Sequence, residues 1–132
     1  MLTADEIDVR MGFDTLAAIG TMGGSGAVIV MDETTDIVKA TYILARFFHH
    51  ESCGQCTPCR EGTGWAYRVL GRILKGQGRP EDPDLLLEMA GNIKGGRCLC
   101  PLGDAACGPI ESSIRKFREE YDAYVRRAPV TA

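Results

Sequence analysis

The 132-residue chain has no long apolar run, no excess of basic charge and no leader-like segment at its start. Its longest purely aliphatic run, Ala27 to Met31, is far shorter than the ~20 apolar residues that span a bilayer. A basic stretch followed by an apolar one, typical of a secretory signal, is absent. The formal net charge of −3 gives no basic field that would attract nucleic acid. We therefore expect a globular protein that neither inserts directly into a membrane nor binds nucleic acid.

The chain also lacks the two common nucleotide-binding motifs. Neither G-x-G-x-x-G nor G-x-x-x-x-G-K-[ST] occurs in it. The glycine-rich stretch 20–26 precedes an apolar run, whereas a dinucleotide fingerprint follows a strand and opens a helix. We therefore expect this chain by itself to bind no nucleotide cofactor.

Cysteine and glycine are the residues present in excess, with six and 16 copies respectively. The hydrophobic share of 45% and the charged share of 25% are ordinary for a soluble globular protein. Without a secretory leader a reducing compartment is the default, and there cysteines indicate metal binding more than disulfides.

Residues 1–35 differ in pattern from the rest of the chain. A short helix is expected over Asp14–Ile19, followed by the glycine-rich stretch 20–26 and the apolar, β-branched run 27–31. Such a run is typical of a buried strand. One strand cannot bury both of its faces or pair both of its edges, so its partners must lie elsewhere. We therefore interpret the chain as a fragment, or as a subunit severed from a larger partner.

Apolar residues recur at helical spacing from residue 36 onward. Together with capping residues, prolines and glycines, this periodicity predicts four helices. Their approximate ranges are 36–50, 61–75, 83–94 and 109–127. Four helices joined by short loops indicate a small bundle. The residues expected on its buried faces are Ile37, Ala40, Leu44 and Phe47; Trp65, Val69 and Ile73; Leu86, Met89 or Ala90, and Ile93; and Ile110, Ile114, Phe117, Tyr121 and Val125.

Three cysteines at successive spacings of three, Cys53, Cys56 and Cys59, form the pattern C-x2-C-x2-C. This spacing lets one tight loop aim three sulfurs at one small object, with Gly54 easing the turn and Pro58 stiffening the chain. A [4Fe–4S] cluster needs four cysteines, of which three commonly come from one loop. A structural zinc site more often uses two separate pairs of ligands. The pattern therefore favours an iron–sulfur cluster over zinc.

The fourth ligand would be Cys98, Cys100 or Cys107, all of which lie between the third and fourth predicted helices. Spacing alone does not choose among them, although the position of Cys100 before Pro101 favours a directed, exposed sulfur. A cysteine that is not a ligand is expected to pack as a small buried hydrophobe.

Charged side chains near these cysteines allow two interpretations. Arg60, Lys94 and Arg97 either stabilise a negatively charged cluster or are solvated charges at helix ends and in loops. His49 and His50 are expected on the surface at the end of the first helix.

The segment Glu51-Ser-Cys-Gly-Gln-Cys-Thr-Pro-Cys-Arg-Glu-Gly62 resembles the cluster loop of the NADH-oxidising flavoprotein component of respiratory complex I. This is the NuoF family of NADH-quinone oxidoreductases. The resemblance covers effectively the whole chain, including 24–33, 36–39 and Cys100-Pro-Leu-Gly-Asp104. In the last of these segments the family has its fourth ligand, as C-x-L-G-D. The resemblance therefore selects Cys100.

The resemblance implies a mainly α domain over residues 36–132, a four-helix bundle holding one [4Fe–4S] cluster on Cys53, Cys56, Cys59 and Cys100. Residues 1–35 would be the last, strand-containing piece of a ubiquitin-like (SLBB) domain. FMN and NADH would be bound by a domain upstream of this chain. By itself the chain would bind neither FMN nor NAD and would not be catalytic.

The implied function is electron transfer within a multisubunit NADH dehydrogenase (quinone). The cluster would accept electrons from NADH-reduced FMN and pass them to the next iron–sulfur centre. The implied partners are the small [2Fe–2S] subunit, the large iron–sulfur subunit and the upstream FMN/NADH domain. The implied location is the cytoplasm, on the inner face of the bacterial plasma membrane, or the mitochondrial matrix in a eukaryote.

The sequence leaves two alternatives open. Flavoprotein subunits of NAD-dependent hydrogenases and formate dehydrogenases share the triple-cysteine loop, so the parent complex could be one of these. A zinc-stapled helical interaction module is the alternative without redox chemistry.

Overall fold

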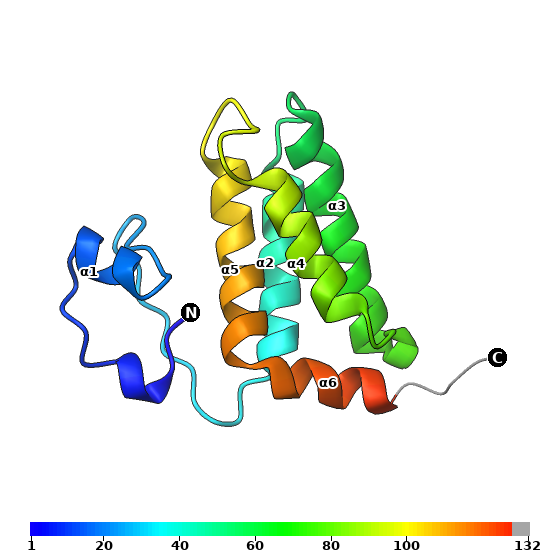
Figure 1. The fold of residues 1–132 in the computed structure, drawn as a ribbon, viewed down its shortest axis with the longest axis horizontal. Coiled ribbons are helices and arrows are strands. Elements are labelled where there is room, and N and C mark those ends of the chain that lie inside the picture. Colours follow the sequence, from blue (N-terminus) through cyan, green and yellow to red (C-terminus); the bar gives the residue numbers. More distant parts are fainter. Residues whose placement is uncertain (128–132) are drawn as a thin grey trace.

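The structure, a computed structural model, describes residues 1–127, and all of its regular elements in that range are helices. Four helices run side by side and form the body of the molecule: α2 (Ile37–Glu51), α3 (Thr57–Arg72), α4 (Asp82–Ile93) and α5 (Leu102–Lys116) (Figure 1). Each packs against the next, and α5 also packs against α2, so the four enclose one core. The predicted mainly α fold with a small four-helix bundle is confirmed.

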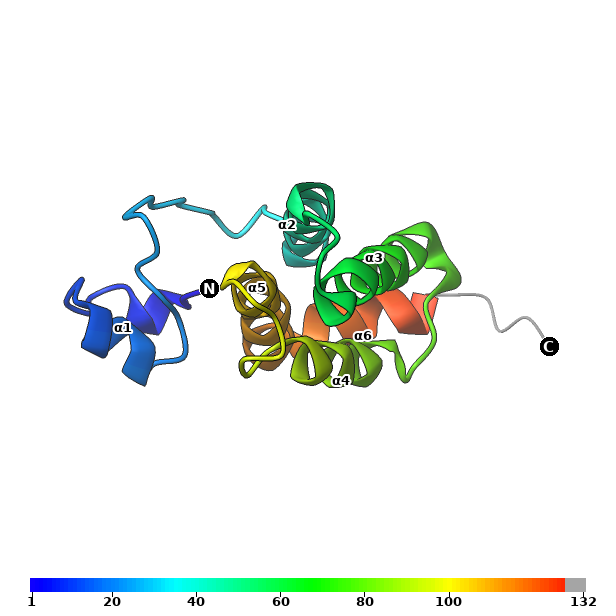
Figure 2. The ribbon, with the colours of Figure 1, turned by 90° about the horizontal axis from the view of Figure 1, so that it is seen from above.

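The remaining elements lie at the edges of the bundle. The wide helical turn η2 (Ile73–Gln77) extends α3, and α6 (Arg118–Arg127) crosses the end of the bundle that lies away from the α2–α3 and α4–α5 loops (Figure 1). Residues 1–36 carry the short helices η1 (Ala4–Glu6) and α1 (Phe13–Ala18) and lie beside α5, outside the bundle (Figure 2). The described residues contain no helix that is both long enough and apolar enough to cross a membrane.

The helix predicted to begin at Pro109 begins earlier, so this prediction is wrong. α5 starts at Leu102 and contains Pro109 in its interior, where the ring costs one backbone hydrogen bond. The same helix stops at Phe117, whose backbone (φ −130°, ψ 37°) breaks the predicted continuous helix into α5 and α6. Across the break the hydroxyls of Ser113 and Tyr121 lie 2.8 Å apart in the buried interior. The pairing of two buried hydroxyls stabilises the bend.

α3 also begins a turn earlier than the predicted Glu61. Thr57 opens it, and Pro58 stands in its first turn, where a missing N–H costs nothing. Cys59 therefore lies on the helix and not in the loop before it. By contrast, α2 begins where expected: the Asp36 side chain accepts a hydrogen bond of 2.8 Å from the Lys39 N–H.

The buried face of α2 differs from the predicted one. Ile37 is buried as expected, but Val38, Thr41 and Ala45 complete the face, and Phe47 is 55% exposed. Small side chains at 41 and 45 let α2 approach its neighbours closely, which a stripe of larger residues would prevent.

Trp65 is likewise half-exposed, at 50%, so its predicted place in the core is wrong. The adjacent Ala66 occupies the buried position instead. The other expected core positions are largely confirmed, since the following are buried: Val69, Ile73, Leu86, Ala90, Ile93, Ile110, Ile114, Tyr121 and Val125.

Residues 1–36 form the short helix α1 as expected but no strand, and none forms anywhere in residues 1–127. The run predicted as a buried strand is exposed, at 66% for Val28, 90% for Val30 and 38% for Met31. Without neighbouring strands its backbone has no edge to pair with. The Glu6–Lys116 ion pair, with Oε2 and Nζ 2.6 Å apart, attaches the segment to α5. The assignment of residues 1–35 to a ubiquitin-like domain stays a prediction.

Candidate metal centre

The two cysteine-bearing loops lie at the same end of the bundle. The α2–α3 loop carries Cys53 and Cys56 and leads directly into Cys59 on α3, and the α4–α5 loop carries Cys98 and Cys100 (Figure 1). Because α2 packs on α3 and α4 packs on α5 within one bundle, segments distant in sequence end side by side. The fold therefore brings the predicted fourth ligand to the side of the molecule that holds the first three.

One hydrogen bond joins the two loops directly. The backbone N–H of Leu99 donates to Cys56 Sγ at 3.2 Å. Leu99 lies between the two candidate fourth ligands, Cys98 and Cys100. Amide donors directed at cysteine sulfur are one of the means by which proteins stabilise iron–sulfur clusters.

The α2–α3 loop is held in shape by its own polar groups. Gly54 adopts a φ of +80°, a backbone conformation that residues with a Cβ rarely take. Its carbonyl accepts a 2.8 Å hydrogen bond from the Arg60 guanidinium, which also pairs with Glu61. The Ser52 hydroxyl stands 3.3 Å from Cys59 Sγ and accepts a 3.4 Å bond from the Gly54 N–H.

The α4–α5 loop has a comparable set of contacts. Gly95 and Gly96 both have positive φ, and the Gly95 N–H donates to Asp104 Oδ1 at 2.7 Å. The Arg97 guanidinium donates to the carbonyls of Gly91 and Lys94, at 2.9 and 2.8 Å, at the end of α4. Arg97 therefore holds the helix end that precedes the loop.

The three candidate fourth ligands have different surroundings. Cys100 is exposed, whereas Cys98 is half-buried with its sulfur 3.7 Å from the Ile93 carbonyl. A methyl group on Gly103 would come within 2.7 Å of Cys98 Sγ, so that sulfur is closely packed. Burial, followed by the nearby Cys59 and Cys56, raises the pKa of Cys98. Cys98 therefore lies near Cys56 and Cys59, as a fourth ligand would have to.

Cys107 is a buried core residue, as expected for a cysteine that is not a ligand. Its side chain is 1% exposed, and its thiol donates to the carbonyls of Ala90 and Gly103 at 3.3 and 3.2 Å. Burial, then the charges of Glu111 and Asp104, raises the pKa of this thiol to about 12.

The donor set fits an iron–sulfur cluster in its chemistry. Within residues 1–127 no three His, Cys, Asp or Glu side chains are close enough together to hold a metal ion, so the ligand set stays a prediction. The groups at this end of the bundle are nevertheless thiols, the ligands that such clusters take. The bond from the Leu99 N–H to Cys56 already brings the facing loop onto one of those sulfurs.

The charged side chains around the site have structural partners, and the two imidazole side chains are exposed. Arg60 and Arg97 bond to backbone carbonyls as described, and Lys94 pairs with Glu111. His49 and His50 are exposed in the last turn of α2, as predicted.

Sequence reasoning missed Ser52 and Asp104 as residues of the site. Ser52 directly precedes Cys53, and Asp104 ends the motif C-P-L-G-D. Their positions in these motifs were the available signal.

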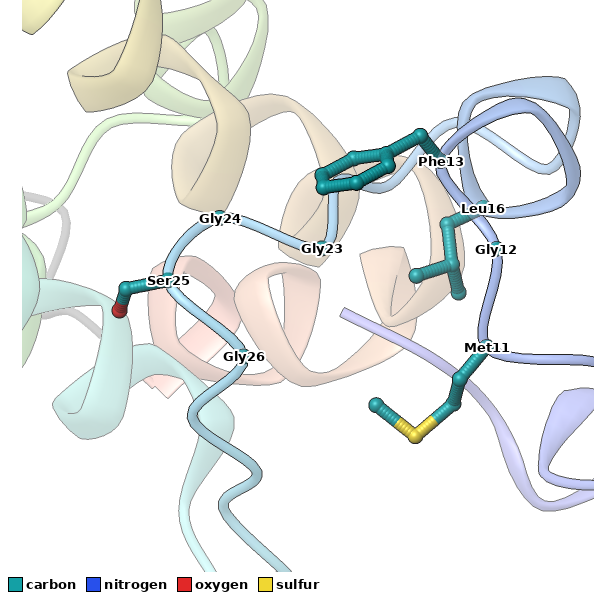
Figure 3. A pocket seen from close by; sticks show the side chains of 8 residues that line it. All are labelled: Met11, Gly12, Phe13, Leu16, Gly23, Gly24, Ser25 and Gly26. Atoms are coloured by element: carbon teal, nitrogen blue, oxygen red, sulfur yellow. The ribbon is translucent and has the colours of Figure 1, made fainter.

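A separate hollow of about 300 Å³ lies among residues 11–26, away from the cysteines. Figure 3 shows Met11, Phe13 and Leu16 around it, facing the glycine-rich stretch 23–26. No titratable side chain lines it, so it offers no chemistry that competes with the cysteine loops.

Comparison with known proteins gives consistent results. Residues 39–124 match the family described as the NADH-ubiquinone oxidoreductase-F iron-sulfur binding region. The F-subunit of NADH-quinone oxidoreductase from Rickettsia massiliae (strain Mtu5) is 49% identical over 119 residues, 90% of this chain and 28% of that protein. The corresponding protein of Rickettsia bellii (strain OSU 85-389) is 49% identical over 116 residues, 88% of this chain and 28% of that protein. The chain thus spans little more than a quarter of these relatives.

Among solved structures, NAD+-reducing [NiFe]-hydrogenase in the H2-reduced state is similar, with a TM-score of 0.81 and 29% sequence identity. The similarity covers 93% of this chain and 20% of the hydrogenase chain. The air-oxidised state of that enzyme gives a TM-score of 0.82 at the same identity and the same coverage.

Proposed function

Since the chain belongs to the NADH-ubiquinone oxidoreductase-F iron-sulfur binding region family, we propose that it is the cluster-binding, electron-transfer domain of a NADH dehydrogenase flavoprotein subunit. The ligands of one [4Fe–4S] cluster are Cys53, Cys56, Cys59 and Cys100. The observation that carries the proposal is the meeting of the two cysteine loops through the Leu99 N–H and Cys56 Sγ. That contact, at 3.2 Å, joins segments that are far apart in the sequence.

When bound, a [4Fe–4S] cluster supplies a site that gains and loses one electron at a time. The side chains of this chain hold and shield that site. Cys59 is only 7% exposed, so the protein shields this residue from water, whereas Cys53 and Cys100 are exposed. The packed helices below the loops limit movement when the charge of the site changes.

Cys100 is proposed as the fourth ligand over Cys98 for two reasons. Cys100 occupies the first position of the C-x-L-G-D match. In addition, its sulfur is exposed, whereas the Cys98 sulfur packs against Gly103 and the Ile93 carbonyl.

We extend the proposal to the whole protein by analogy with the relatives. The similar Rickettsia proteins are F-subunits of NADH-quinone oxidoreductase. We place this chain between an upstream FMN and NADH domain, with residues 1–35 as the end of an intervening ubiquitin-like domain, and the next iron–sulfur centre. Its partners are the small [2Fe–2S] and large iron–sulfur subunits. It acts in the cytoplasm or the mitochondrial matrix, as part of a complex on the membrane surface.

A second parent complex is favoured by one observation. The similar solved structures are chains of a NAD+-reducing [NiFe]-hydrogenase, and the similarity covers 93% of this chain. The same cluster domain would serve a hydrogenase without any change in its own chemistry.

Anaerobic reconstitution of the chain with iron and sulfide tests the proposal. We expect a brown protein with about four irons and four sulfides per chain. Broad visible absorption and an EPR signal on reduction with dithionite are expected as well. A colourless protein that retains one zinc per chain under the same conditions would contradict the proposal. Titration with FMN should give no stoichiometric binding.

A further inference from the structure

Ser52 places a hydroxyl group against the sulfur of Cys59, the least exposed of the three cysteines 53, 56 and 59. Its backbone N–H ends α2 by donating to the Phe48 carbonyl at 3.1 Å. Its Oγ lies 3.3 Å from Cys59 Sγ. The backbone and the side chain of Ser52 therefore have separate partners. A side-chain substitution can remove the hydroxyl contacts to Cys59 and Gly54 and leave the backbone bond to Phe48 in place.

The direction of the hydrogen bond follows from the neighbours of the hydroxyl. Ser52 Oγ accepts the N–H of Gly54 at 3.4 Å, so a lone pair is engaged and the hydroxyl hydrogen is available to Cys59. A cysteine sulfur that ligates iron carries no hydrogen and can only accept. In the cluster-bound protein Ser52 must therefore be the donor.

Water cannot easily replace this donor. Cys59 is 7% exposed, and Ser52 itself is half-buried. A hydrogen bond from a hydroxyl to a charged acceptor is stronger than one between neutral groups, and it is strengthened further where the local dielectric is low.

We propose that Ser52 is a positioning residue that raises the midpoint potential of the cluster by donating its hydroxyl hydrogen to Cys59 Sγ. The inference rests on the proposed function, because it requires Cys59 to be a ligand. One-electron reduction adds negative charge to the cluster and its sulfurs. A donor at one sulfur stabilises the reduced form more than the oxidised form and so raises the potential.

The test compares Ser52→Ala with Ser52→Thr in the full 132-residue chain, reconstituted anaerobically with iron and sulfide. The readouts are the midpoint potential from an EPR-monitored dithionite titration, the iron content per chain and the helix content by circular dichroism. Ser52→Ala should load the same amount of iron and shift to a more negative potential. Ser52→Thr keeps a hydroxyl, so its midpoint potential should lie close to that of the wild type.

Ser112→Ala is the matched control. Its hydroxyl donates to the Gly108 carbonyl at 2.8 Å and accepts from the Met1 ammonium at 2.7 Å, and it contacts no cysteine, so its loss should leave the potential unchanged. If Ser52→Ala takes up the cluster but keeps the wild-type midpoint potential, the proposed role of Ser52 is overturned and the proposed function is not. Loss of iron or of helix content in Ser52→Ala also overturns it, because the hydroxyl would then act on assembly or on the fold. A wild-type chain that takes up no cluster instead contradicts the proposed function.

Discussion

Gly62 on α3 and Ile93 at the end of α4 are in such close contact that the glycine has no room for a side chain. A methyl group built on Gly62 would stand 2.6 Å from Ile93 Cγ1 and 2.7 Å from Cδ1. Gly62 lies one turn beyond Cys59, and Ile93 directly precedes the loop with Cys98 and Cys100. This contact is therefore a point of close approach between α3 and α4, each of which adjoins one of the cysteine loops.

The first prediction concerns that contact. Gly62→Ala should lower the free energy of unfolding by about 1–3 kcal/mol, because an added methyl overpacks the interface. Urea unfolding followed by circular dichroism measures the change. In the double variant with Ile93→Ala the cost of Gly62→Ala should shrink, since the clashing atoms are removed.

Gly91→Ala is the control for the effect of replacing a helical glycine. Nothing lies within 4 Å of a methyl group there, so the substitution should be neutral or stabilising by about 0.5–1 kcal/mol. Equal stabilities for Gly62→Ala and Gly91→Ala would contradict the close contact.

The second prediction concerns the ligand set. Cys100→Ser should lose most of the reconstituted iron, whereas Cys98→Ser and Cys107→Ser should keep it. Cys107 is buried and bonded to backbone carbonyls, and Cys98 packs against Gly103. Iron and sulfide analysis per chain measures the outcome. Equal loss of iron in Cys98→Ser would identify Cys98 as a ligand in place of, or beside, Cys100.

The third prediction concerns the ion pair between Arg72 and Asp82. The Asp82 side chain is fully buried and accepts hydrogen bonds from Arg72 Nε at 3.0 Å and from the Arg79 N–H at 2.9 Å. Asp82→Ala should lower the free energy of unfolding by about 3–5 kcal/mol, since it leaves a partly buried guanidinium unpaired.

The exposed pair of Asp84 and Arg118 is the matched control. The Asp84 side chain is 65% exposed, and Asp84→Ala should cost about 1 kcal/mol or less. Urea unfolding measures both variants, and similar losses in the two would show that burial of Asp82 contributes nothing.

The fourth prediction concerns pH and the attachment of residues 1–19. The Lys116 ammonium and then the Thr3 N–H lower the pKa of Glu6 from 4.5 to about 2. A carboxyl whose pKa is lowered by folding stabilises the folded state above its unfolded pKa. That contribution is lost as the pH falls from about 4.5 to about 2.

Carbon-13 NMR titration of the Glu6 carboxyl measures this prediction. The wild-type pKa should lie near 2, and Lys116→Met should return it most of the way toward 4.5. An unchanged titration in Lys116→Met would show that the ion pair does not form in solution.

The sequence predicted which cysteines belong to the candidate site better than it predicted the contacts that surround them. Cys53, Cys56 and Cys59 were recognisable because ligand chemistry demands a residue type at a fixed spacing. Ser52 could not be recognised in the same way. A serine beside a cysteine is common, and only the turn at Gly54 directs its hydroxyl toward Cys59 on the following helix.

The sequence by itself determined the cysteine spacing, the presence of the bundle helices and most of the buried positions on α3 to α6. These are local properties, set by side-chain type and by periodicity along one segment. Only the tertiary structure decided that Ala66 and not Trp65 is buried, that Pro109 lies within α5 and that Val38 and Thr41 face the core. Each of these outcomes depends on how closely a neighbouring helix approaches, which a single segment does not encode. The same packing brought Leu99 to Cys56 and so made one end of the bundle a candidate cluster site.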